Sequence, residues 1–209
     1  MAIGELSAVA VLILALLHEQ PMHPYQVHQN LVERGDTRLV RVNAGAVYHG
    51  VERLEKEGLV EAAGTERAGN RPERTTYRIT EAGRSAFAAR LTSFLGDDHP
   101  SYPLFPVGLA EAHEIPSQTV VEQLTRRRDR ESERMALLWS ARDRLTSLGL
   151  PRRYLLDVEH EIATLGADIA WLDRTVDELR ADALGWGQPI PREYAEARHE
   201  LKACQTPPA

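Results

Sequence analysis

The segment from Asn43 to Gly58 constrains the fold of this chain more than any other stretch of the sequence. Asn43 is a favourable helix N-cap, because its side-chain oxygen accepts a hydrogen bond from an otherwise unpaired backbone N–H. Gly58 suits the left-handed position that ends a helix. Between them Val47, Val51 and Leu54 recur at i, i+4 and i+7, which is the spacing of one apolar helix face. The segment therefore predicts a capped amphipathic helix.

The opposite face of this predicted helix is small at its N-terminus and then aromatic and polar. It carries Ala44, Gly45, Tyr48, His49 and Glu52. A helix in a DNA major groove needs this profile, with little bulk where backbones approach and donors aimed at bases or phosphates. An ordinary amphipathic surface helix has the same pattern, so the segment alone leaves both interpretations open.

Two further helices are predicted before this segment. An apolar run of good helix formers from Leu6 to about Glu19 indicates a largely buried first helix. Residues 20–24 interrupt it with two prolines, and Pro24 can begin a second helix that ends before Gly35. Residues 36–42 then link to the Asn43 helix. Three helices in this order predict a helix-turn-helix core.

A β-hairpin is predicted after Gly58. Residues 59–62 begin a strand, residues 66–72 are rich in turn formers, and residues 74–79 alternate with β-forming side chains. A helix from Glu81 to about Gly96 follows. Arginines near the hairpin tip suggest contact with phosphates or a minor groove, although ordinary surface arginines would also fit. These arginines are Arg67, Arg71 and Arg74.

Long helices are predicted in the C-terminal half. Three prolines within residues 97–106 mark a linker, followed by a short helix at about 107–113 and a long helix from Ser117 to about Ser147. A last helix is predicted from Pro151 to Leu184, about 50 Å long at 1.5 Å per residue. Apolar residues spaced alternately by three and four form a seam along it. They are Leu155, Val158, Ile162, Leu165, Ile169, Leu172, Val176 and Leu179.

This seam predicts a homodimer. The preceding helix covers part of it, and a second copy of the chain is the natural cover for the rest. Complete cover within one chain is the alternative. Three tryptophans in the same half could sandwich a small aromatic ligand, although core or dimer packing explains them as well. They are Trp139, Trp171 and Trp186.

Charge and cysteine content limit the function further. Residues 1–90 carry 11 basic and 11 acidic side chains, so the net charge of −6 lies in residues 91–209, and the N-terminal part suits a polyanion better. The single cysteine, Cys204, excludes an internal disulfide and fits a reducing cytoplasm. The apolar run at residues 8–17 is too short to span a membrane. The sequence His160-Glu161 lacks the second histidine of a zinc motif, and no phosphate-binding glycine loop is present, so we expect no metal, cofactor or enzyme activity.

The chain resembles the PadR family of transcriptional regulators over residues 6 to about 90. The resemblance rests on residues 21–25, on Val47-Tyr48 with residues 53–60, and on residues 71–84. Pro24 stands where the family usually has glycine, and Thr76 where a second aromatic residue often precedes the tyrosine. The resemblance implies a winged helix-turn-helix dimer, usually a repressor, that binds operator DNA and often responds to small aromatic effectors.

The expected fold is therefore mainly α, with a winged helix-turn-helix domain of three helices and a two-stranded wing. We expect this DNA-binding domain at residues 1–96, a linker at 97–106, a helical dimerisation domain at 107–184 and a tail at 185–209. A dimeric winged-helix scaffold that binds protein instead of DNA is the alternative, because residues 1–90 carry no net charge. The residues expected to contact double-stranded DNA are Arg41, Asn43, Ala44, Gly45, Tyr48, His49, Arg53, Arg67, Arg71 and Arg74.

Overall fold

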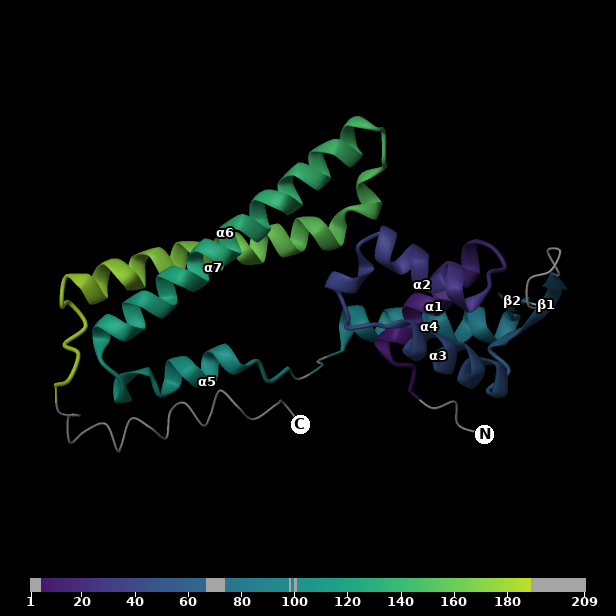
Figure 1. Cartoon of the computed structure of the whole chain (residues 1–209), viewed down its shortest axis with the longest axis horizontal. Coiled ribbons are helices and arrows are strands. Elements are labelled where there is room, and N and C mark those ends of the chain that lie inside the picture. Colours follow the sequence, from purple (N-terminus) through teal and green to yellow (C-terminus); the bar gives the residue numbers. More distant parts are fainter. Residues whose placement is uncertain (1–4, 67–73, 98, 100, 189–209) are drawn as a thin grey trace. The chain divides into compact units, whose positions relative to one another are not determined.

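The computed structural model describes residues 5–66, 74–97, 99 and 101–188. Within these residues it has seven α-helices and one two-stranded antiparallel sheet, which confirms the predicted mainly helical fold (Figure 1). The chain divides into two compact units, Met1–Ser101 and Tyr102–Ala209. The division falls inside the segment predicted as a linker.

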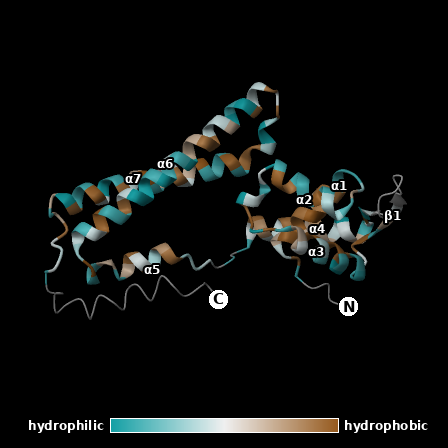
Figure 2. Ribbon diagram, viewed as in Figure 1, coloured by the Kyte–Doolittle hydropathy of each residue, from teal (hydrophilic) through white to brown (hydrophobic). Residues whose placement is uncertain are grey.

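Unit 1 is built around the apolar helix α1 (Ala8–Glu19), which is strongly hydrophobic along its length (Figure 2). The Ser7 hydroxyl caps it by accepting a hydrogen bond from the Ala10 amide at 3.2 Å. Ile13 and Leu14 of α1 are completely buried. They share one core with buried residues of α2 (Pro24–Glu33), α3 (Ala44–Lys56) and the sheet. No helix in the described part of the chain is both long and apolar enough to cross a membrane.

The predicted hairpin is present as β1 (Val60–Glu66) and β2 (Arg74–Ile79). The two strands pair from Val60 opposite Ile79 to Glu66 opposite Arg74, with an irregularity between Ala62 and Gly64. An additional bridge joins Met22, in the turn before α2, to Tyr77 of β2 through two backbone hydrogen bonds of 3.0 and 2.9 Å. The base of the wing is therefore attached to the turn between α1 and α2.

Helix α4 (Glu81–Gly96) follows β2 and closes unit 1, as predicted. Its cap, Thr80, accepts from the Gly83 amide at 3.0 Å and donates to the Gly58 carbonyl at 2.8 Å. Gly83 lies against the Leu59 backbone, and a Cβ at this position would be 2.0 Å from the Leu59 carbonyl oxygen. The exit of α3 and the start of α4 are thus fixed to each other by close backbone contact.

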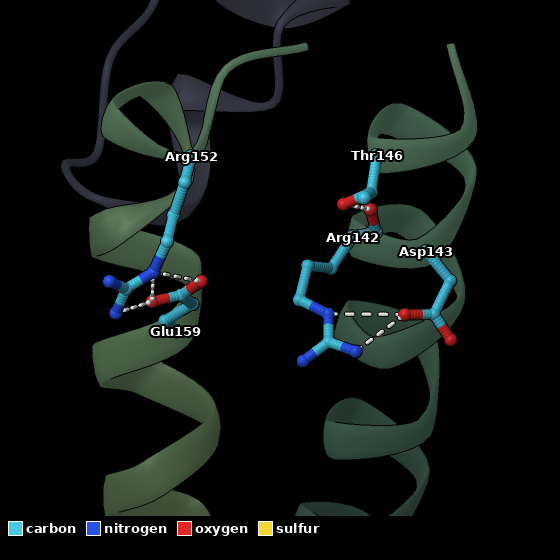
Figure 3. Close-up of polar contacts among 5 residues, drawn as sticks. All are labelled: Arg142, Asp143, Thr146, Arg152 and Glu159. Atoms are coloured by element: carbon cyan, nitrogen blue, oxygen red, sulfur yellow. Dashed lines mark hydrogen bonds and ion pairs between the residues drawn. The ribbon is translucent and has the colours of Figure 1, made fainter. Parts of the chain in front are cut away.

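Unit 2 consists of a short helix α5 (Leu104–Ala110) and a hairpin of two long helices, α6 (Ser117–Ser147) and α7 (Leu156–Arg180), which lie side by side (Figure 1). Buried residues at the start of α6 and the end of α7 form its main core, with Phe105 and Leu109 of α5 packed against it. Near the turn of the hairpin, Arg152 donates hydrogen bonds to Glu159, and Arg142 donates to Asp143 (Figure 3).

Two boundaries in unit 2 differ from the prediction. Helix α5 begins at Leu104, inside the predicted linker and before the predicted start at 107, because Pro106 stands in its first turn, where proline is tolerated. Helix α7 has 25 residues and is about 38 Å long, shorter than the predicted helix from Pro151 to Leu184. Residues Arg152–Tyr154 form a separate 3-10 turn, and Asp182 has a left-handed backbone (φ 54°) that prevents continuation.

Candidate nucleic-acid interface

Helix α3 is positioned as the sequence predicts. The Asn43 side chain accepts a hydrogen bond from the Ala46 amide at 2.9 Å, and Gly58 has the left-handed backbone (φ 74°) that ends the helix. Val47, Val51 and Leu54 are buried in the core of unit 1. Ala44 and Gly45 are exposed, so the backbone at the N-terminus of α3 is open to a ligand.

Gly50 explains how α3 approaches α1. A Cβ at Gly50 would lie 2.5 Å from Cδ1 of Ile13, a completely buried residue of α1. The glycine in the middle of α3 thus permits close packing against α1, at a cost in helix propensity of about 1 kcal/mol relative to alanine. This contact supports the face of α3 that is turned away from solvent.

Tyr48 and His49 are both on the exposed side of α3, but their surroundings differ. The Tyr48 ring lies edge-on to the His23 ring with centroids 5.9 Å apart, and Tyr48 keeps 38% of its surface exposed. The His49 side chain is 84% exposed, with Nδ1 3.4 Å from a carboxylate oxygen of Glu52. Tyr48 is therefore held against the start of α2, whereas His49 projects into solvent.

The supporting role of His23 was missed in the sequence. Its Nδ1 accepts from the Tyr25 amide at 3.0 Å, and its own amide donates to the Gln26 side chain at 3.0 Å, which makes a capping box at the start of α2. A signal was present, since Gln26 stands three residues after His23, at the spacing of a capping box.

The predicted positioning arginines lie at the margins of α3. Arg41 is exposed just before the helix. Arg53 is half exposed and lies 3.7 Å from Glu57 one turn later. Both residues thus border the exposed face of α3, and their contact with DNA stays a prediction.

Only one of the three arginines predicted near the tip of the wing lies within the described residues. The backbone of Arg74 pairs with Glu66 at the far end of the ladder, while Arg67 and Arg71 lie outside the described residues. At the base of the wing, Tyr77 is partly buried against the core of unit 1. Burial and the negative charge of the nearby Glu55 carboxylate raise the pKa of Tyr77. Tyr77 therefore serves the wing as a packing residue that also touches α3.

The predicted dimer seam is covered largely within the chain. Leu172, Val176 and Leu179 are buried in the core that α7 shares with α6, and Leu155, Ile162 and Leu165 are buried as well. Val158 and Ile169 are half-buried. In the described chain the seam residues are thus largely buried, those near the end of α7 against the start of α6, and the pairing of the seam with a second copy stays a prediction.

The three tryptophans lie in separate surroundings. Trp139 is stacked by the Arg142 guanidinium at 3.9 Å, and Trp171 lies edge-on to Phe105. Trp186 packs on the core of unit 2, and its indole N–H donates to the Ile115 carbonyl at 2.9 Å. Within the described part of the chain no two tryptophan rings are in contact, so the three do not make one aromatic cage. The contact of Trp186 also places this residue with unit 2, although the tail was predicted to begin at 185.

The start of the predicted tail is thus described only as far as residue 188. The rest of the predicted tail, with Cys204, lies outside the described residues. Among the residues that are described, no cluster of three or more histidine, cysteine, aspartate or glutamate side chains has the arrangement of a metal site.

Comparisons with known proteins agree with this geometry. Residues 13–89 match the transcriptional regulator PadR-like family. The fold is similar to that of Bacillus subtilis PadR in a crystal structure with operator DNA, with a TM-score of 0.68 and 16% identity over 83% of this chain and 99% of that one. The same Bacillus subtilis protein with p-coumaric acid gives a TM-score of 0.67 and 14% identity over the same shares.

A PadR-like transcriptional regulator from Bacillus cereus is also similar, with a TM-score of 0.62 and 18% identity over 83% of this chain and 99% of that one. A search of curated protein sequences gave no match. At these identities the solved structures establish the fold, and the family match covers the helix-turn-helix and the wing.

Proposed function

Through residues 13–89 the chain belongs to the PadR-like family of transcriptional regulators, and we propose that it acts in the cytoplasm as a homodimeric repressor on a pseudo-palindromic operator. The chain is thus a DNA-binding transcriptional regulator and not an enzyme. The observation that carries the proposal is the build of α3, whose apolar stripe is buried while its capped N-terminus and polar face are open to solvent. Two copies of α3 enter major grooves about 34–36 Å apart.

Each predicted contact residue has a role in this proposal. Tyr48, held by His23, binds a phosphate, and the more exposed His49 binds a phosphate or a base edge. The open N-terminus of α3 at Ala44 and Gly45 favours a phosphate through its unpaired amides and helix dipole. Basic side chains around the helix and on the wing fix the position of the protein on the duplex. These are Arg41, Arg53, Arg67, Arg71 and Arg74.

We propose that the dimer forms through apolar side chains of unit 2 that remain exposed in the single chain. Leu137 and Leu148 on and just after α6 are 73% and 74% exposed, and Leu156 at the start of α7 is 53% exposed. Burying such side chains against a second copy is favourable, because each removes apolar surface from water. The seam residues near the end of α7 hold the two long helices together.

Sedimentation analysis tests the dimer. Leu137→Glu and Leu148→Glu should convert it to a monomer, while Leu95→Glu, at an 89% exposed position of α4 in unit 1, should leave it paired. A wild-type chain that remains monomeric at working concentrations contradicts the proposal, and variants that stay dimeric contradict the assigned surface.

A small aromatic effector is the proposed signal that releases the operator. Support comes from the p-coumaric acid complex of the Bacillus subtilis protein and from the Phe105 and Trp171 contact beside the core of unit 2. Such a ligand acts only if it binds one dimer geometry more tightly than another. Titration with p-coumaric acid should quench tryptophan fluorescence and lower the DNA-bound fraction together. Quenching without release would make the compound a ligand but not an effector.

A protein-binding winged-helix scaffold is the competing function, and the zero net charge of residues 1–90 favours it. Fluorescence anisotropy with labelled DNA from the upstream region of the protein's own gene separates the two functions. The regulator should bind this DNA with an affinity that falls as salt rises, and more tightly than a shuffled sequence. Equal binding to both sequences, or none, would favour the scaffold. Repression is then measured by a reporter gene placed behind the bound site.

A further inference from the structure

The exposed side of α3 contains a stripe that lies directly opposite its buried stripe. Gly45, His49, Glu52 and Lys56 follow one another at spacings of four, three and four residues, and all four are exposed. Residues at these spacings share one face of a helix. The Glu52 side chain is 68% exposed. When α3 lies in a groove, this stripe points at the floor of the groove, where the base edges are.

Glu52 is an unusual residue for this face. Phosphates surround a major groove, and a carboxylate there is repelled unless it meets a hydrogen-bond donor. The two other carboxylates near the end of α3 are engaged within unit 1. Glu55 acts on the Tyr77 phenol at the base of the wing more strongly than Glu52 does, and Glu57 lies 3.7 Å from Arg53. Glu52 lies 3.4 Å from the still more exposed His49, one turn earlier on the same helix, and most of the Glu52 side chain remains open to solvent.

We propose that Glu52 reads the operator by accepting a hydrogen bond from the N4 amino group of a cytosine, an inference that rests on the proposed DNA-binding function. An ionised carboxylate has acceptors and no donor. Guanine presents two acceptors in the major groove, and thymine presents one acceptor and a methyl group. Adenine presents its amino group beside the N7 acceptor, whereas the cytosine amino group is the favoured partner of a glutamate.

Glu52 then gives specificity mainly by exclusion. Its charge makes every site that lacks a correctly placed amino group unfavourable, which is how a polar contact rejects wrong partners. Removal of the charge should therefore have two separable effects. The preference for cytosine at one position of each half-site should disappear, and affinity for unrelated DNA should rise.

Selection of binding sites from a randomised DNA library tests the proposal with the full-length protein. The wild type should select cytosine at one position in each half-site, and a duplex with a different base there should bind about tenfold more weakly. Glu52→Gln should move that preference to adenine, because glutamine pairs with the adenine N6 and N7 groups. Glu52→Ala should show no preference at that position while the rest of the selected site is unchanged.

Glu55→Gln is the matched control, because it removes the same charge from the same helix at a position that faces the wing. It should leave the selected cytosine unchanged. If all three variants select the wild-type site, Glu52 does not read a base, although the proposed function stands. If the wild type itself selects no sequence, the proposed function fails and this inference fails with it.

Discussion

The His23 ring, at the N-cap of α2, packs edge-on against the Tyr48 ring of α3 with centroids 5.9 Å apart. One side chain therefore both caps the second helix of the helix-turn-helix and restrains a proposed phosphate contact on the third. Because Nδ1 of His23 accepts from the Tyr25 amide, the ring orientation is fixed by the cap itself.

This ring pair separates the packing role of Tyr48 from its proposed phosphate contact. Tyr48→Phe should keep the unfolding free energy of the wild type while it weakens DNA binding, because the ring remains and only the hydroxyl is removed. His23→Ala should lower the unfolding free energy by about 1 kcal/mol, because the cap of α2 is removed. Chemical denaturation and anisotropy titrations measure the two effects. Full DNA affinity in Tyr48→Phe would exclude a contact through the hydroxyl.

The wing arginines should contribute to affinity without regard to sequence. Replacement of Arg71 and Arg74 by alanine should weaken binding to operator and unrelated DNA alike, and should reduce the salt slope by about 1 for each phosphate that is no longer bound. The double variant Arg152→Ala with Arg153→Ala is the control, because it removes two positive charges from the turn between α6 and α7 in unit 2. If the double variant of Arg71 and Arg74 keeps the wild-type salt slope, the wing arginines do not contact phosphates.

The ion pair between Glu19 and Arg34 should make the stability of unit 1 depend on acid pH. Arg34 donates to both Glu19 oxygens, at 2.5 and 2.7 Å, and this hydrogen bond lowers the pKa of Glu19 below its ordinary 4.5. The contribution is thus present above pH 4.5 and is lost as the pH falls through the folded-state pKa. Since both side chains are about half exposed, it should amount to less than about 1 kcal/mol.

Denaturation of wild type and Glu19→Gln at several pH values checks this dependence. The difference in unfolding free energy should be largest near neutral pH and should disappear in acid, where Glu19 is protonated. Glu33→Gln, at an exposed position of α2, should follow the wild type throughout. A difference that persists unchanged into acid would show that the pair is not its source.

Two glycines of unit 1 should respond differently to alanine. Gly83→Ala should destabilise by about 1–3 kcal/mol, because the new Cβ meets the Leu59 backbone, which cannot move without shifting the exit of α3. Gly50→Ala meets the terminal Cδ1 of Ile13, and the gain in helix propensity of about 1 kcal/mol offsets the strain. In thermal unfolding, Gly83→Ala should therefore have a lower melting temperature than Gly50→Ala. Addition of Ile13→Val should remove the steric strain of the Gly50→Ala variant but not that of the Gly83→Ala variant.

Unit 1 was largely predictable because its signals are local. Asn43, Gly58 and the stripe of Val47, Val51 and Leu54 define α3 within one stretch of sequence, and the caps of the neighbouring helices are equally short-range. The contacts that join these elements were not predictable. The bridge of Met22 to Tyr77 and the approach of Gly83 to Leu59 depend on how separate segments pack, which no local spacing reveals.

In unit 2 the periodicity predicted an apolar face on α7 but could not predict which helix covers it. The alternate spacing of three and four correctly gave an apolar face on α7, but this pattern is the same whether the partner helix belongs to the same chain or to another. Within one chain, the core that the two helices share joins the start of α6 to the end of α7. The surroundings of the three tryptophans were not predictable for a related reason, because spacing in the sequence did not indicate that each ring has different neighbours. Their role in effector binding stays a prediction.

The closure of the α7 seam by α6 has a consequence for the life of the assembly in the cell. Because apolar residues of α7 are buried against α6 of the same chain, each newly synthesised chain should fold its helical hairpin before it meets a second copy. Two separately prepared samples of the protein should therefore exchange subunits when they are mixed, while each hairpin stays folded.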